Sequence, residues 1–169
     1  LNSFVMLRTW TFVDTCGNSA SVSQTINVND NVAPVTPNAP ADVFVQCADE
    51  VPPPSELMAT DNCNGPIYAY PVEQTFPGSC PNNFVKVRTW TFTDDCGNSS
   101  SVSQTINVKD NIAPVAPNAP ADVFVQCAGD VPYPVDLTAM DNCAGPIMAY
   151  AQDLTIPGQC PNNYTIIRT

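Results

Sequence analysis

Two short motifs in the chain alternate apolar and polar residues, and each motif occurs twice. SVSQTINV, at 21–28 and 101–108, has the two-residue period of a strand with one buried face. ADVFVQC, at 41–47 and 121–127, has the same period. The residues predicted to face inward in the second copies are Val102, Gln104, Ile106 and Val108, then Val123, Val125 and Cys127. Both motifs therefore predict half-buried strands.

Further strands are predicted where β-branched and aromatic residues concentrate. They lie at 57–60, at 67–76 with an interruption at Pro71, and at 84–92. The turns predicted between strands, where Gly, Pro and Asn gather, are at 61–66, 76–83 and 94–99. No stretch of about twelve residues has helical periodicity, so the fold class is all-β, and short strands at this spacing predict a β-sandwich.

The whole sequence repeats with a period of 80 residues and without insertion. Residues 1–80 and 81–160 are identical at 55 of 80 positions. The cysteines coincide in four pairs, namely Cys16 with Cys96, Cys47 with Cys127, Cys63 with Cys143 and Cys80 with Cys160. A regular period of this length predicts a tandem array of like domains.

Proline-rich segments lie between the predicted domains. Pro34, Pro37 and Pro40 recur at every third residue, which matches the three-residue turn of polyproline II. One interpretation is a semi-rigid linker that holds neighbouring domains at a fixed spacing, and the other is a proline-capped start of an edge strand. The boundaries predicted are the C-terminal strands of an incomplete repeat at 1–33, a complete repeat at 34–113, and the N-terminal strands of a further incomplete repeat at 114–169.

Charge and cysteine content limit the classes of partner. The chain has 5 Lys+Arg against 16 Asp+Glu, a formal net charge of −11, so we expect no nucleic acid or anionic lipid partner. No apolar run approaches the roughly 18–20 residues of a membrane helix, so no membrane span is predicted. The 8 cysteines occur without histidine and without a C-x-x-C pair, which predicts disulfides and an extracellular or cell-surface location.

The motifs TDNC, GSCPNN, RTWTFTDDCGN and QTINVKDNIAP resemble the hyalin-repeat-like, immunoglobulin-like modules of bacterial cell-surface and adhesin proteins, especially those of Bacteroidota. The resemblance covers the whole chain. It implies immunoglobulin-like β-sandwiches in tandem, with an 80-residue period, on a secreted or surface-anchored protein. It implies no enzymatic activity.

The strand order of such modules also implies a disulfide connectivity, with the DNC and DDCGN turns at one end of a domain. The bridges implied within the chain are Cys63 with Cys96, Cys47 with Cys80, and Cys127 with Cys160 by periodicity. Each would close a segment of 33 positions and contribute about 3–4 kcal/mol. Cys16 and Cys143 are then expected to pair outside the chain.

Two kinds of assembly would complete the partial repeats. In both, the expected partner is an adjacent repeat or another copy of the chain. Either neighbouring repeats of one long chain complete them, or residues 1–28 of one subunit complete the sheet of 114–169 in another by strand exchange. The correspondence of 161–169 with 1–9 favours the continuous array. The predicted function is a structural extracellular filament or fibre.

The alternative function is an adhesin module that binds carbohydrate or protein on a surface through its loops. Differences between the two copies cluster at 53–60 and 68–79, as divergence of binding loops would require. Drift at exposed positions of a rod would produce the same clustering.

Candidate calcium ligands follow the last strand of each repeat. NDN at 29–31 and KDN at 109–111 place oxygen ligands at domain junctions, with Asp14, Asp61 and Asp94 or Asp95 in turns nearby. The candidate ligands are Asp30, Asn31, Asp110 and Asn111. The alternative is that these residues form Asx turns that cap strand ends.

Other residues are assigned from their type and their neighbours. Asn98 and Asn163 stand in N-glycosylation sequons, and Thr36 is a candidate for O-glycosylation. Without histidine, a Ser or Cys nucleophile lacks its usual base, so no enzymatic activity is expected. The residues predicted to be structural are the core aromatics Trp10, Phe12, Trp90 and Phe92, and the arginines Arg8, Arg88 and Arg168, which would pair with carboxylates or aromatic faces.

Overall fold

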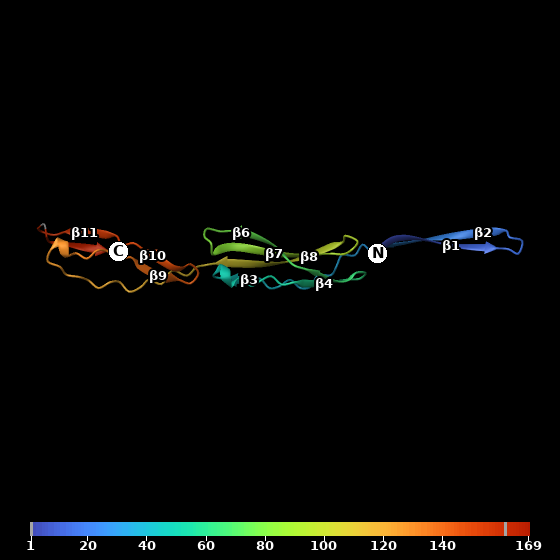
Figure 1. Ribbon diagram of the computed structural model, residues 1–169. Coiled ribbons are helices and arrows are strands. Elements are labelled where there is room, and N and C mark those ends of the chain that lie inside the picture. The colour runs from blue at the N-terminus through green and yellow to red at the C-terminus, as the bar shows by residue number, and fades with distance from the viewer. Residues whose placement is uncertain (1, 161) are drawn as a thin grey trace.

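The computed structural model describes residues 2–160 and 162–169. It is built of strands, with two single-turn 3₁₀ helices and, among the described residues, no α-helix. Figure 1 shows three bodies in a row, which we call the N-terminal hairpin, the central module and the C-terminal segment. In this part of the chain, no helix has the length and apolarity needed to span a membrane.

The N-terminal hairpin consists of β1 (Ser3–Val13) and β2 (Ser19–Asn29), which pair antiparallel along their full length. Trp10 is 44% exposed and Phe12 is 62% exposed. The prediction that these two aromatics are core residues is therefore wrong for this structure. Alternation defines which face of a strand is apolar, but it does not show whether a second layer covers that face.

The central module has two layers of strands. One layer is a four-stranded sheet in the order β3-β8-β7-β6, and the other is the hairpin β4-β5. The bounds are β3 (Val43–Val45), β4 (Leu57–Asp61), β5 (Gly65–Ala69), β6 (Val72–Pro77), β7 (Asn83–Thr93) and β8 (Ser99–Lys109). The 3₁₀ helix η1 (Ala48–Glu50) follows β3. All of the predicted strands in this range form, within a few residues of the expected bounds.

The core of the central module lies between these layers. Trp90 and Phe92 of β7 are 1% and 0% exposed and pack with Ala59 of β4. The Trp90 indole N–H donates to the Ser55 carbonyl at 2.9 Å, so its polar atom is satisfied. The alternation predicted for β8 is confirmed, because Gln104, Ile106 and Val108 are buried and Val102 is half-buried.

The arginines of β7 and β12 (Tyr164–Arg168) pair with acidic residues on the strands beside them, as a structural role predicts. Arg88 is buried, and its guanidinium donates to Glu73 at 2.7 Å and to the Pro52 carbonyl at 2.7 Å. Arg168 donates to both carboxylate oxygens of Asp153.

The proline-rich segment that precedes β3 lies along the central module. Val35 bridges Thr60 of β4 antiparallel, while β3 pairs parallel with β8. Pro34 is buried and its carbonyl accepts from Ser100 at 2.6 Å, and Gln104 donates to the Ala41 carbonyl at 2.7 Å. The linker interpretation is therefore wrong and the edge-strand interpretation is confirmed. The segment joins the two layers of one module and does not space two modules apart.

The C-terminal segment repeats the order of elements from η1 to β7. It contains η2 (Ala128–Asp130), β9 (Leu137–Asp141), β10 (Gly145–Ala149), β11 (Asp153–Pro157) and β12. The strand predicted at 121–127 does not form, and Phe124 is 96% exposed. Its counterpart β3 is held only by pairing with β8, and the positions 80 residues beyond β8 lie outside the 169-residue sequence. Without a partner strand, the alternating pattern does not produce a strand.

Candidate functional site

Two turns lie together at the end of the central module that faces the N-terminal hairpin, as the resemblance implied. In the first, one oxygen of Asp61, Oδ1, accepts the backbone N–H groups of Cys63 and Asn64 at 2.9 and 2.8 Å. In the second, Oδ1 of Asp94 accepts the N–H groups of Cys96 and Asn98, both at 2.8 Å. Gly65 and Gly97 have φ of 77° and 90°, a left-handed conformation that favours glycine. The second oxygen of Asp61 accepts no hydrogen bond, whereas the second oxygen of Asp94 accepts from the Asn98 side chain at 2.8 Å.

Asp30, the residue after β2, meets both turns, and we call this place the first junction. Asp30 is 8% exposed and its N–H donates to the Asn2 carbonyl at 3.0 Å. Its own carbonyl accepts from the Asn98 side chain at 3.2 Å, and Asn2 donates to Asn64 at 2.9 Å. These hydrogen bonds tie the hairpin to the end of the module.

Carboxylates dominate the first junction. One carboxylate oxygen from each of Asp30, Asp61 and Asp94 lies within 4.8 Å of the others. Oδ2 of Asp30 and Oδ2 of Asp61 are buried and accept no hydrogen bond. Burial raises the pKa of Asp94, but the hydrogen bonds from Asn98, Cys96 and Gly97 outweigh it and leave this pKa below the ordinary 3.8. Three acidic groups thus meet where no protein cation pairs with them among the described residues.

Two thiols lie beside this cluster. Partial desolvation raises the pKa of the Cys63 thiol, and the Asp30 carboxylate raises it further. Desolvation also raises the pKa of Cys96, again with Asp30 adding to the effect. Both groups are therefore held as neutral thiols and not as reactive thiolates.

The structure divides the predicted calcium ligands between two places. It brings Asp30 to Asp61 and Asp94, whereas Asn31 is exposed. Asp110 and Asn111 lie at the opposite end of the central module, after β8. The Asx-turn interpretation is confirmed, because Oδ1 of Asp30 accepts from the Val32 N–H and Oδ1 of Asp110 from the Ile112 N–H, each at 3.1 Å. In Asp30, the turn occupies Oδ1 and leaves Oδ2 without a hydrogen bond. Calcium binding stays a prediction.

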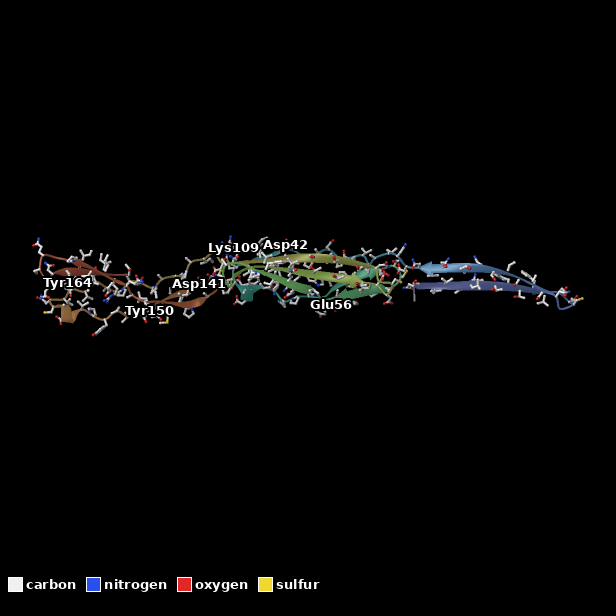
Figure 2. All side chains as sticks on the ribbon, turned by 90° about the horizontal axis from the view of Figure 1, so that it is seen from above. Asp42, Glu56, Lys109, Asp141, Tyr150 and Tyr164 are labelled. Atoms are coloured by element: carbon white, nitrogen blue, oxygen red, sulfur yellow. A yellow bond between two sulfur atoms is a disulfide. The ribbon has the colours of Figure 1, made fainter. Side chains whose placement is uncertain are left out.

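A disulfide joins the central module to the C-terminal segment at what we call the second junction. Cys47, at the end of β3, is bonded to Cys143 of the β9–β10 turn, with Cα atoms 5.1 Å apart. A hollow beside this bond is lined by Cys80, Asp110 and Asp141 among other residues. Figure 2 shows Asp141 where the C-terminal segment meets the central module.

This disulfide differs from the implied connectivity. Cys47 was expected to pair with Cys80, and Cys143 was expected to pair outside the chain. The cysteines unbonded in the structure are Cys16, Cys63, Cys80, Cys96, Cys127 and Cys160, so the expected Cys63–Cys96 and Cys127–Cys160 bridges are not formed either. The implied scheme considered one domain at a time, whereas the β9–β10 turn of the next segment abuts the end of the module where Cys47 lies.

The candidate glycosylation residues differ in their surroundings. The Asn98 side-chain nitrogen donates to the Asp30 carbonyl and to Asp94 Oδ2, so a glycan on this nitrogen would disrupt the first junction. Asn163 is exposed and Thr36 is half-buried. Glycosylation of Asn163 and Thr36 stays a prediction.

The sequence interpretation missed the role of Asp141 and Cys143 at the second junction. The 80-residue period contained the information, since these residues correspond to Asp61 and Cys63 of the first junction. The two junctions are therefore built from the same sequence positions, shifted by one period.

Comparisons with known proteins identify the central module. Residues 35–108 match the family model described as HYR-like domain with 4 cysteines, which is a structural and not a catalytic family. The cysteines in the matched range are Cys47, Cys63, Cys80 and Cys96. Neither the curated proteins nor the solved structures contain a significant match to the chain. The match confirms the hyalin-repeat resemblance for residues 35–108, which are similar to HYR-like domains with 4 cysteines.

Proposed function

We propose that the chain is part of an extracellular structural rod, in which immunoglobulin-like modules follow one another end to end and adjacent modules are joined by a disulfide. The observation that carries this proposal is the Cys47–Cys143 bond across the second junction. A binding domain on a flexible tether has no need of a covalent bond between its own end and the next repeat. A stiff spacer does, because the bond removes a hinge.

The 80-residue period extends this arrangement to other junctions. Cys63 occupies the sequence position of Cys143 one period earlier, and Cys127 occupies that of Cys47 one period later. Each repeat would then give one cysteine to the repeat before it and another to the repeat after it. Such bonds require an oxidising compartment, which supports an extracellular location.

Exposed apolar faces on the two outer bodies support completion by neighbouring repeats. Trp10 and Phe12 on the N-terminal hairpin are exposed, whereas Trp90 and Phe92, one period later, are buried by β4 and β5. A β4–β5 layer from another repeat would cover the first pair in the same way. We propose an adjacent repeat as that partner, with strand exchange between subunits as the alternative.

The adhesin alternative has less support. The positions that differ most between copies, 53–60 and 68–79, fall largely on β4, β5 and β6 and not in loops at one end. The turns around Asp61 and Asp94, both at one end of the central module, take part in the first junction. Loops engaged in junctions are not free to bind a surface.

Small-angle X-ray scattering of the oxidised full chain tests the rod. Strands of 11 residues at about 3.3 Å per residue make the hairpin and the central module each about 36 Å long. Three bodies in a row then give a radius of gyration of about 30 Å, against about 15 Å for a compact chain of 169 residues. Cys143→Ser should broaden the distance distribution by freeing the second junction, and Cys127→Ser serves as the control.

A compact oxidised chain, or equal rigidity with and without the bond, would contradict the rod. Retention of the full chain on immobilised carbohydrate, lost on substitution of exposed β5 residues such as Tyr68, would favour the adhesin instead.

A further inference from the structure

We propose that Asp30, Asp61 and Asp94 bind a calcium ion at the first junction. The three residues come from three segments, namely the end of the N-terminal hairpin, the end of β4 and the turn after β7. One carboxylate oxygen from each lies within 4.8 Å of the other two, which is a spacing that a single cation can bridge. The site stands on this geometry and does not depend on the proposed rod.

The second observation is that two of these carboxylates have oxygens that no hydrogen bond satisfies. Asp30 is 8% exposed, and both its Oδ2 and the Oδ2 of Asp61 are buried without a donor. A buried carboxylate oxygen without a partner is strongly unfavourable, and neighbouring carboxylates add mutual repulsion. The cluster therefore lacks a positive charge.

Among the described residues, no cationic side chain pairs with these carboxylates. The ion pairs among the described residues are Lys86 with Glu73, Arg88 with Glu73, and Arg168 with Asp153, all on other strands. The whole chain has only 5 Lys+Arg. A cation from solution is the remaining source.

The turns hold the carboxylates in place for such an ion. Oδ1 of Asp30 accepts from one backbone N–H, and Oδ1 of Asp61 accepts from two. In both residues the opposite oxygen, Oδ2, is the free one. Both oxygens of Asp94 accept hydrogen bonds, but a carboxylate oxygen has a second lone pair available for a metal. The ligands are thus positioned before the ion arrives.

The chemistry of the ligands selects calcium. All members of the cluster are carboxylates, and no thiol sulfur or imidazole belongs to it, which favours a hard cation. Calcium accepts six to eight oxygens in variable geometry, whereas magnesium demands a near-ideal octahedron and keeps several waters. Three fixed carboxylates on separate turns meet the first requirement more easily than the second.

The second junction contains the matching half of this site. Asp110 and Asp141 lie one period after Asp30 and Asp61, and both line the same hollow. The position one period after Asp94 would be 174, which lies beyond the 169-residue sequence. The described residues therefore include one cluster of three carboxylates at the first junction, and two aspartates that line one hollow at the second.

Calcium titration of the full chain, after removal of metal with EDTA, tests the site. We expect one ion per chain by isothermal titration calorimetry and a rise in melting temperature that magnesium does not reproduce. Asp61→Asn keeps the turn acceptor but removes the free carboxylate oxygen, so it should weaken calcium binding at least tenfold. In EDTA the same variant should melt at the wild-type temperature or higher, because it removes repulsion. A purely structural role for Asp61 predicts the opposite result in EDTA.

Asp14→Asn is the matched control, because Asp14 forms the same turn in the N-terminal hairpin but lies outside the cluster. Its calcium binding should equal that of the wild type. If Asp61→Asn fails to fold by circular dichroism, Asp30→Asn takes its place. No binding by the wild type at about 10 mM calcium, above the range of extracellular modules, would overturn the proposal. Equal responses to calcium and magnesium, or equal affinity in the Asp61 and Asp14 variants, would overturn it too.

Discussion

Trp90 and Trp10 occupy the same position in successive repeats, so truncating each in turn separates the effect of sequence from that of burial. Trp90 is 1% exposed and Trp10 is 44% exposed. A tryptophan removes roughly 150–250 Å² from water on full burial, which at about 25 cal/mol per Å² gives an upper value of about 4–6 kcal/mol. Trp90→Ala should therefore lower the free energy of unfolding by about 3–5 kcal/mol, the usual range for a buried tryptophan.

Trp10→Ala should lower the free energy of unfolding of the central module by less than about 0.5 kcal/mol. The N-terminal hairpin contributes no residue to the core around Trp90, so its loss of packing stays local. Chemical unfolding followed by circular dichroism measures both variants with one probe. The unfolding measurements should be made at protein concentrations where the chain is monomeric, because a second copy could cover Trp10.

Fluorescence quenching gives a second readout, because the chain has only 2 tryptophans. The tryptophan that remains in Trp10→Ala is Trp90, which should resist a soluble quencher. The tryptophan that remains in Trp90→Ala is Trp10, which should be quenched readily. Equal unfolding costs, or equal protection from the quencher, would refute the conclusion that the hairpin face is uncovered.

Three further predictions concern the disulfide, an ion pair and a turn. Cys143→Ser should expose Cys47 to alkylation by a thiol reagent, as measured by peptide mapping, whereas protection of Cys47 in this variant would indicate the Cys47–Cys80 bond instead. Hydrogen bonds from Lys86 and then Arg88 hold the pKa of Glu73 below the ordinary 4.5, so its contribution is complete above that value and is lost as the pH falls through the lowered pKa. The difference in unfolding free energy between wild type and Glu73→Gln should therefore be largest near neutral pH and should shrink in acid. It should remain below about 1 kcal/mol because Glu73 is partly exposed. A difference that grows in acid would contradict the pairing. Gly97→Ala should lower the unfolding free energy by about 1–2 kcal/mol because φ is 90° at this residue. Gly17→Ala, at φ 91° in the N-terminal hairpin, should leave the unfolding free energy of the central module unchanged. Equal effects would place Gly17 within the same cooperative unit as the central module.

The sequence predicted the strands of the central module well, because local alternation and turn residues determine them. β7, β8 and the two Asp-centred turns were all expected near their observed positions. The pattern at 121–127 failed because a parallel strand needs a partner from a distant segment, and no local pattern reports whether that partner is present. Tertiary pairing decided the outcome there.

The candidate site was predicted in part. The NDN motif identified Asp30, and the turns identified Asp61 and Asp94 as neighbours, but the motif also included Asn31, which is exposed. Side-chain geometry determines which carboxylate oxygen accepts the hydrogen bonds of a turn and which accepts none, and residue spacing does not reveal this geometry. The Cys47–Cys143 bond was missed because spacing within one repeat contains no information on how successive repeats abut.

The position of that bond also decides how the chain would respond to tension along the row of bodies. The covalent path from the N-terminal hairpin reaches Cys47, crosses to Cys143 and continues into the C-terminal segment, bypassing a sequence separation of 96. Trp90, Phe92 and all strands of the central module except β3 lie within the bypassed length. A pull on the two ends can therefore strip the edge segment up to Cys47 from the module, but the enclosed core carries no tension. Under stretching, the module lengthens by the reach of that short segment and no further until the bond itself is reduced.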